Sequence, residues 1–208
     1  MNIIESMEQG SQEWLELRLG KVTASKFKDV MTNGRGNKPS ATAKTYMIKL
    51  IAEILRGEPL PFFENDAMKW GTETEPQARA MYELKNDVEV KEVAFVELNE
   101  FVGVSPDGLV GEDGLLEIKC PNTETQIKRF LDDVGLPSDY EAQVQGQLWV
   151  TGRQWCDFVS FDPRIDVEAS YIQTRVYRDE EYIAKLEEKV SIFVEEMKSM
   201  INKLTGEK

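Results

Sequence analysis

Histidine is absent from this chain of 208 residues, and only two cysteines occur, Cys120 and Cys156. The absence of histidine excludes nucleophile pairs and triads that depend on an imidazole base, and it excludes zinc sites with histidine ligands. Two cysteines are too few for a disulfide framework or a cysteine-rich zinc site. Any chemistry must therefore come from carboxylates, lysines and hydroxyl groups.

Long apolar runs are also missing. No stretch approaches the roughly 18 apolar residues that cross a membrane, and the N-terminal segment lacks the apolar core of a signal peptide. We therefore expect a cytoplasmic protein with no membrane contact. A chain of 208 residues buries enough apolar surface to fold without disulfides, so we expect residues 1–208 to form a single domain.

Charge is distributed unevenly along the sequence. The net charge is −13, from 38 acidic and 25 basic residues. The segment 18–56 contains nine basic residues against only Asp29 and Glu53, a net +7, which leaves −20 for the rest of the chain. Such a segment can bind a polyanion on one face of an acidic protein, or it can be a solvated basic helix without a partner.

Apolar spacing predicts an α/β protein of the α+β type, with one small mixed β-sheet flanked by helices. Helical patterns cover residues 11–19, 23–30 (capped by Thr23 or Ser25), 41–56, 68–84, 139–150 and 183–204. Strand patterns cover residues 88–96, 101–104, 115–118, 158–161 and 171–176. The last helix is amphipathic, and we expect it to pack on the sheet rather than to form a subunit interface.

The most informative segment is Gly103–Pro121, GVSPDGLVGEDGLLEIKCP. Its Gly-Glu-Asp-Gly sequence predicts a hairpin that turns at residues 112 and 113. That register places Asp107 opposite Ile118, one residue from Glu117. Because side chains alternate along a strand, Glu117 and Lys119 lie on the same face. Two carboxylates and a lysine are therefore expected to converge.

Two carboxylates with a backbone carbonyl suit Mg²⁺ or Mn²⁺, which prefer oxygen ligands. Such a metal acidifies a bound water and stabilises charge on a phosphoryl oxygen. Lys119 would then hold the attacking water or neutralise the transition state. The alternative is an ordinary turn followed by a cross-strand charge pattern. We favour the catalytic interpretation because Glu117 and Lys119 interrupt an apolar run. Burying a charged side chain there costs free energy, and a function would explain why the charges are kept.

An aspartate followed about ten residues later by Glu-x-Lys resembles the PD-(D/E)xK nuclease superfamily. The resemblance extends to the lambda exonuclease and YqaJ-type viral recombinase family. In order along the chain, the similar stretches are LRLGKVTAS, KWGTETEPQAR, SPDG, EIKCP, YEAQVQGQLWVTG and FDPR. This resemblance implies a restriction-endonuclease-like core. It also implies a processive exonuclease that degrades one strand of linear double-stranded DNA from the 5′ end. Such an enzyme would depend on Mg²⁺, with Mn²⁺ as a substitute, and would hold two ions in each active site.

In that family, Asp107, Glu117 and the carbonyl of Ile118 would bind metal, and Lys119 would activate the attacking water. The resemblance adds two further catalytic candidates, Glu75 as an acidic residue at the metal site and Gln143 as a residue that orients the reactive end. Glu75 has a rival interpretation as a surface ion pair with Arg79, and Gln143 as a solvated helix residue. Gln145 is a less suitable substitute, because it lies on the far side of the helix from Gln147.

The resemblance also assigns a pocket for a 5′-phosphate to Arg18, Ser25 and Ser105, since a guanidinium and two hydroxyls suit a terminal phosphate. Arg35 corresponds to a loop residue that enters the minor groove, and Met68 to an apolar wedge between strands. Their alternatives are a solvated helix residue for Arg18, a helix cap for Ser25, a mobile loop for Arg35 and a core position for Met68.

The family forms a ring-shaped homotrimer around DNA, which suits a basic channel inside an acidic exterior. Its partner is a phage single-strand annealing protein that loads on the exposed 3′ strand. Two rival functions stay open. One is a PD-(D/E)xK endonuclease, either a restriction enzyme or a junction resolvase, and the other is a DNA-end-binding module without catalysis.

Overall fold

The computed structural model describes residues 1–5, 7, 9–32, 34, 39–61 and 64–206. Its strands form two mixed sheets where the sequence led us to expect one. The first sheet contains, in spatial order, β1 (Asn2–Ile4), β4 (Phe95–Asn99), β5 (Val102–Val104) and β2 (Val22–Thr23). The second contains β3 (Val90–Lys91), β6 (Gly108–Val110), β7 (Gly114–Lys119), β8 (Trp155–Phe161) and β9 (Tyr171–Tyr177). The predicted α/β class is confirmed.

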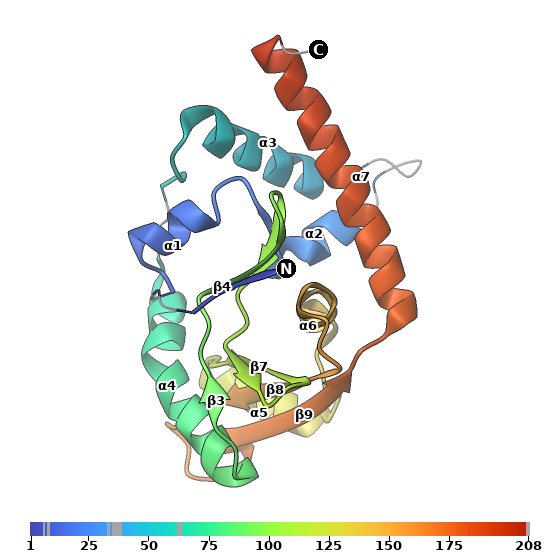
Figure 1. Ribbon diagram of the computed structural model, residues 1–208. Helices are drawn as coiled ribbons and strands as arrows, with labels where there is room; N and C mark the ends of the chain where they lie inside the picture. The colour runs from blue at the N-terminus through green and yellow to red at the C-terminus, as the bar shows by residue number, and fades with distance from the viewer. Residues whose placement is uncertain (6, 8, 33, 35–38, 62–63, 207–208) are drawn as a thin grey trace.

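Helix α6 (Ser138–Thr151) lies between the two sheets, seen nearly end-on at the centre of Figure 1. It contacts β4 and β5 of the first sheet and β8 of the second. Its apolar residues Ala142, Val144, Leu148 and Val150 are all buried. A helix that is covered on every side ordinarily excludes polar side chains, so the buried glutamines of α6 require an explanation.

The remaining helices surround these layers (Figure 1). They are α1 (Gln12–Leu17), α2 (Phe27–Met31), α3 (Ala41–Arg56), α4 (Asp66–Asn86), α5 (Thr123–Asp132) and α7 (Glu180–Thr205). Helix α5 follows β7 directly and was not among the predicted helices, although Ile127, Phe130 and Leu131 have helical spacing. Helix α4 contacts β7 and β8, and α2 and α3 contact α7.

Local sequence signals set several helix ends. The Ser11 side chain accepts a hydrogen bond from the backbone N–H of Trp14 and begins α1, and Gly57 ends α3 with φ 70°. Of the two predicted caps, Thr23 takes the N-cap position of a 3₁₀ turn (Ala24–Lys26) that precedes α2, but its side chain makes no capping hydrogen bond. The cap predicted at Ser25 is wrong, because Ser25 lies inside this turn.

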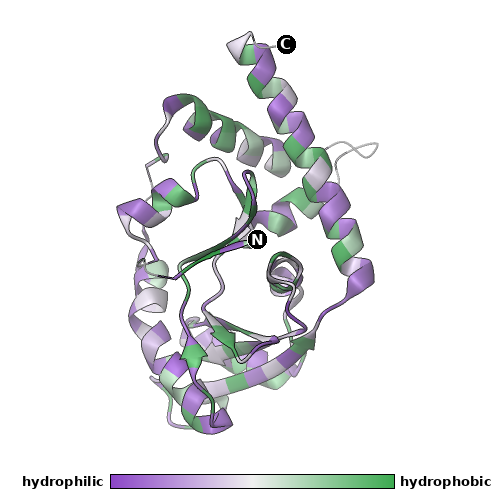
Figure 2. Ribbon diagram, viewed as in Figure 1, coloured by the Kyte–Doolittle hydropathy of each residue, from purple (hydrophilic) through white to green (hydrophobic). Residues whose placement is uncertain are grey.

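The C-terminal helix α7 has the predicted amphipathic pattern, visible as alternating hydrophilic and hydrophobic residues in Figure 2. It packs on α2, α3 and α6 rather than on a sheet, which corrects the expected partner. Ile183, Leu186, Val190 and Phe193 are buried in this contact. Among the described residues, no helix is both long enough and apolar enough to cross a membrane.

The predicted hairpin exists, but its register is shifted by one residue. Gly108 pairs with Leu116 and Val110 with Gly114, so the loop contains three residues rather than two. Gly111 begins the loop with φ 53°, a left-handed conformation that glycine adopts without strain. The shift places Asp107 just beyond the paired residues, level with Glu117 instead of Ile118.

Close packing of α6 is testable at Gly146. A Cβ atom there would lie 2.1 Å from Cδ2 of the buried Phe27 ring. We expect Gly146→Ala to lower the free energy of unfolding by up to about 2 kcal/mol, because overpacking against a buried ring costs as much as ~3 kcal/mol and the helix-propensity gain is only ~1 kcal/mol. The matched control is Gly71→Ala in α4, where nothing lies within 4 Å of the added Cβ and only the gain should remain. Urea unfolding measures the free energy of unfolding of both variants. If Gly146→Ala and Gly71→Ala stabilise the protein equally, the packing account is contradicted.

Candidate active site

Glu117 is a carboxylate in the centre of the second sheet. It lies on β7 between β6 and β8, with a side chain that is only 1% exposed. Its Oε1 atom accepts hydrogen bonds from Lys119 Nζ and from Gln143 Nε2 at 2.5 Å, and its Oε2 accepts one from Gln147 Nε2 at 2.6 Å. These three donors offset the cost of burying the charge.

Asp107 approaches the same end of β7 from the loop between β5 and β6. Its Oδ2 atom accepts a hydrogen bond from the backbone N–H of Ile118 at 2.6 Å. Because the N–H and C=O of one strand residue point to the same side, the carbonyl of Ile118 also faces the side of Asp107. The structure thus brings together the two carboxylates and the carbonyl that the sequence selected.

Burial and the mutual repulsion of carboxylates raise the pKa values of two acidic side chains at this site, Asp107 and Glu75. Burial and then the charges of Glu117 and Glu75 raise the pKa of Asp107 well above its ordinary value. The pKa of Glu75 is also raised, by burial and by Glu117, although Arg79 opposes the shift. Glu75 therefore lies close enough to the pair to interact with it. A site with this excess of negative charge favours a bound cation.

Glu75 forms the ion pair with Arg79 that one of its two interpretations predicted. Its Oε1 lies 2.6 Å from Arg79 Nη2, so the predicted ion pair forms, and Arg79 also lies 3.0 Å from Glu92. Within the described ranges, no three Asp, Glu, Cys or His side chains form a group that could hold a metal ion by themselves. The donor set that fits a hard divalent cation is Asp107, Glu117 and the Ile118 carbonyl, which are all oxygen ligands.

Lys119 is the cation of the site. Burial lowers its pKa, but the charges of Glu117 and Asp107 outweigh burial, so the pKa of Lys119 is raised and its side chain stays an ammonium. The Nζ atom lies 5.5 Å from the centre of the Tyr140 ring. The Tyr140 hydroxyl accepts a hydrogen bond from Arg129, at 2.8 Å, which fixes the ring beside Lys119.

Arg18 and Ser105, two of the three residues that the resemblance assigns to a phosphate pocket, are in direct contact. Arg18 Nη1 donates a hydrogen bond to Ser105 Oγ at 2.8 Å. The guanidinium carbon lies 4.0 Å from the centre of the Trp14 ring, and burial lowers the pKa of Arg18 to about 10, which leaves it charged at neutral pH. Trp14 thus holds the guanidinium in place.

Ser25 follows the short strand that pairs with the strand before Ser105. Strands β2 and β5 are parallel, with Val22 level with Val102 and Thr23 level with Gly103. Strand β2 ends at Thr23, and Ser25 follows in the 3₁₀ turn Ala24–Lys26, so the strand register does not extend to Ser25. Ser25 is exposed, so its hydroxyl is available to a ligand. Ser105 is also two residues from Asp107, so the Cα atoms of these two residues are at most about 7 Å apart.

Two residues predicted from the sequence to bind DNA remain, Arg35 and Met68. Arg35 lies outside the described residues. Met68 lies in the first turn of α4 and is 39% exposed, so the alternative of a core methionine is wrong. An exposed methionine at a helix start is available for an apolar contact with a ligand.

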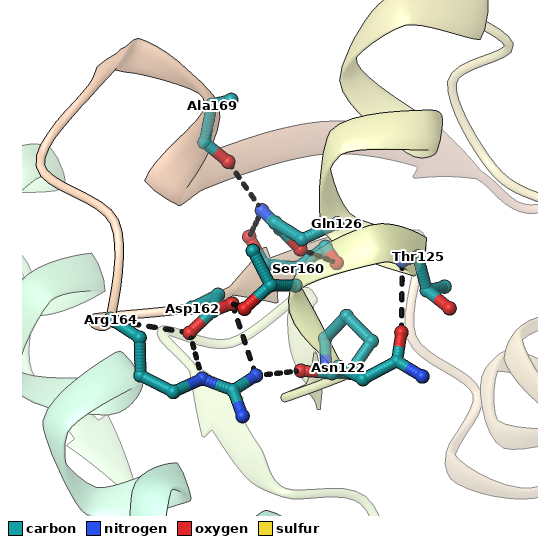
Figure 3. A network of polar contacts seen from close by, with 9 residues as sticks. Asn122, Thr125, Gln126, Ser160, Asp162, Arg164 and Ala169 are labelled. Atoms are coloured by element: carbon teal, nitrogen blue, oxygen red, sulfur yellow. Dashed lines mark hydrogen bonds and ion pairs between the residues drawn. The ribbon is translucent and has the colours of Figure 1, made fainter.

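Polar contacts order the loops beside the candidate catalytic residues (Figure 3). The Asp162 side chain, which is fully buried, accepts hydrogen bonds from Arg164 Nε at 2.7 Å and from Thr123 Oγ1 at 2.6 Å. Arg164 also donates to the carbonyl of Pro121, and its guanidinium stacks on Trp70 at 4.0 Å. The FDPR stretch therefore links the loop after Lys119 to α4, the helix that carries Glu75.

Gln147 is the site residue that the sequence analysis did not select. It lies four residues after Gln143 on the same face of α6, and the (i, i+4) spacing is the signal that would have identified it. Gln145 faces away, as expected: its side chain bonds the Tyr177 carbonyl and the Asp179 N–H.

The repulsion at Asp107 is testable without substrate. In EDTA near neutral pH, we expect Asp107→Asn to raise the free energy of unfolding by roughly 1 kcal/mol, because it removes a repelled charge and keeps an acceptor for Ile118. The gain should shrink as the pH falls toward roughly 4, since protonated Asp107 is also neutral. Glu112→Gln in the exposed hairpin loop is the control, with an expected effect within about 0.5 kcal/mol. Destabilisation by Asp107→Asn would contradict the electrostatic account.

Comparisons with known proteins agree with this geometry. The structure superposes on the alkaline exonuclease LHK-Exo of Laribacter hongkongensis with a TM-score of 0.85 and 43% sequence identity, over 94% of this chain and 96% of that chain. A second structure of LHK-Exo, in complex with dAMP, also gives a TM-score of 0.85 at 43% identity, over 93% and 96% of the two chains. A phage related exonuclease from Haemophilus somnus 129PT shares the fold, with a TM-score of 0.69 and 21% identity over 88% of this chain and 96% of that chain.

A curated relative is 32% identical over 170 residues, the uncharacterized protein R354 of Acanthamoeba polyphaga mimivirus. The match covers 75% of this chain but only 29% of the mimivirus protein. Residues 13–154 match the YqaJ-like viral recombinase domain, a span that includes Arg18, Glu75, Asp107, Glu117 and Lys119. The resemblance read from the sequence motifs is thereby confirmed, and the chain belongs to the YqaJ-like viral recombinase family.

Proposed function

We propose that this protein is a divalent-metal-dependent exonuclease of the lambda exonuclease type. It hydrolyses one strand of linear double-stranded DNA from a 5′-phosphorylated end and leaves 3′ overhangs for recombination by single-strand annealing. The observation that carries the proposal is the convergence of Asp107, Glu117 and Lys119 at one end of β7. Family membership and 43% identity to an alkaline exonuclease support it.

Asp107, Glu117 and the carbonyl of Ile118 would hold Mg²⁺, or Mn²⁺ in its place, with two ions per site. A bound divalent cation supplies an acidified water and neutralises charge on the phosphoryl oxygen. Glu75 supplies further negative charge at the edge of this site and is itself held by Arg79. Gln143 in α6 is half-buried and touches Glu117, and we propose that its amide also orients the reacting DNA end.

Lys119 acts as a cation in this proposal. Its raised pKa keeps all three N–H donors on Nζ, so it donates hydrogen bonds to the attacking water and to the phosphoryl oxygen and does not accept a proton. In the absence of DNA, Glu117 accepts one of these bonds. The ammonium thereby stabilises the charge that develops as the phosphodiester is attacked.

Arg18, Ser25 and Ser105 would bind the terminal 5′-phosphate. The short connection from Ser105 to Asp107 then fixes the distance between the strand end and the scissile bond. This distance defines an exonuclease that removes mononucleotides in the 5′-to-3′ direction. LHK-Exo has been crystallised with a deoxynucleoside monophosphate, the kind of product that stepwise removal releases.

The charge asymmetry supports a ring. The basic segment 18–56 contains β2, α2 and α3 and carries a net +7 within a chain of net −13. A homotrimer that turns these segments inward would enclose DNA and allow processive digestion, with Arg35 in the minor groove and Met68 between the strands. We further propose a cytoplasmic protein that hands its 3′ strand to a phage-type annealing protein.

The proposal is tested by digestion of linear duplex DNA in Mg²⁺, with one 5′-phosphate end, one 5′-hydroxyl end and a closed circle as control. We expect degradation from the phosphorylated end and an intact circle. Lys119→Ala should reduce the rate by about 10²-fold or more, because it removes the cation that stabilises the transition state, while Lys85→Ala in the last turn of α4 should not. Nicked circles would identify an endonuclease instead, and end binding without cleavage a DNA-end-binding module.

The phosphate pocket has its own test. Arg18→Ala should remove most of the preference for 5′-phosphorylated over 5′-hydroxyl ends, about a 10-fold to 100-fold change, because a charged hydrogen bond contributes ~1.5–3 kcal/mol. The matched control is Arg56→Ala, which removes an exposed arginine of the same basic segment. If the preference survives in Arg18→Ala, the 5′-phosphate binds elsewhere.

A further inference from the structure

Gln147 is a fully buried amide that is aimed at the proposed metal ligand Glu117. It lies near the middle of α6, has 0% exposure, and donates from Nε2 to Glu117 Oε2 at 2.6 Å. Its own Oε1 atom is buried and has no hydrogen-bond partner among the described residues. A leucine or methionine at this position would fill the space without leaving an orphan acceptor, so packing alone does not account for a glutamine.

The geometry of Glu117 shows what the amide provides. The terminal torsion of a glutamate is soft, so a single hydrogen bond leaves the carboxylate free to rotate. Gln143 and Lys119 both contact Oε1, and Gln147 is the side chain that contacts Oε2. With both oxygens held, the plane of the carboxylate is fixed. Three of about four acceptor positions are then filled, and one is left for a further ligand.

We propose that Gln147 is a positioning residue that fixes the Glu117 carboxylate for metal binding. This inference rests on the proposed function, since it requires Glu117 to bind a divalent cation. Gln147 acts through Glu117 and does not touch DNA, because it is enclosed between the two sheets. Partners that orient a metal ligand in this way typically change metal affinity by about 10-fold to 100-fold when they are removed.

Gln145 provides a matched control on the same helix. It is also buried, at 4% exposure, and its amide makes two hydrogen bonds, to the Tyr177 carbonyl and from the Asp179 N–H. Neither partner belongs to the active site. Gln145→Met and Gln147→Met therefore make the same chemical change in the same buried helix, and they differ in whether Glu117 loses a donor.

The experiment measures Mn²⁺ binding to the full chain without DNA, by electron paramagnetic resonance, together with the melting temperature and DNA cleavage. We expect Gln147→Met to weaken Mn²⁺ binding by about 10-fold to 100-fold, to raise the metal concentration at half-maximal cleavage equally, and to leave KM for DNA unchanged. Gln145→Met should lower the melting temperature and leave Mn²⁺ affinity at the wild-type value.

Equal Mn²⁺ affinity in Gln147→Met and wild type would overturn the inference, as would equal losses in both variants. If Gln147→Met does not fold, Gln147→Asn takes its place, because a side chain shorter by one methylene group withdraws the amide from Oε2. Wild-type protein that binds Mn²⁺ but does not cleave DNA would refute the proposed function instead, so the two failures are distinguishable.

Discussion

The burial of one carboxylate, Glu117, is the constraint on which the rest of the site depends. A charge at 1% exposure in the middle of a sheet is tolerated only when hydrogen-bond donors surround it. The donors come from β7 itself, through Lys119, and from α6, through Gln143 and Gln147. Helix α6 can supply these donors because it runs between the two sheets. The arrangement of sheet, helix and sheet therefore also holds the side chains of the site in place.

The proposed phosphate pocket and the acidic site share one short connection. Strand β5 leads into Ser105, and Asp107 follows two residues later at the start of the hairpin. The first sheet therefore presents the pocket of Arg18 and Ser105, and the second sheet presents Glu117 and Lys119. A substrate that spans the junction between the sheets would touch both, which relates the fold to an enzyme that acts at strand ends.

Much of this site was predictable from sequence because its residues are close together along the chain. Alternation alone placed Glu117 and Lys119 on one face, and the Gly-Glu-Asp-Gly turn placed Asp107 nearby. The register was wrong by one residue, since a sequence does not distinguish a two-residue loop from a three-residue loop that begins with Gly111 at positive φ. The division into two sheets and the packing of α7 on other helices depend on contacts between distant segments, which periodicity does not report. Gln147 was missed because a glutamine in a helix ordinarily faces solvent.

The central claim is that the oxygen atoms of Asp107, Glu117 and Ile118 form a divalent-metal site. Crystals soaked in Mn²⁺ and measured at a wavelength where manganese scatters anomalously test it most directly. The account predicts an anomalous peak between the Asp107 and Glu117 carboxylates, within bonding distance of the Ile118 carbonyl. A Mn²⁺ ion bound elsewhere, with these two carboxylates unoccupied at saturating metal, would contradict it.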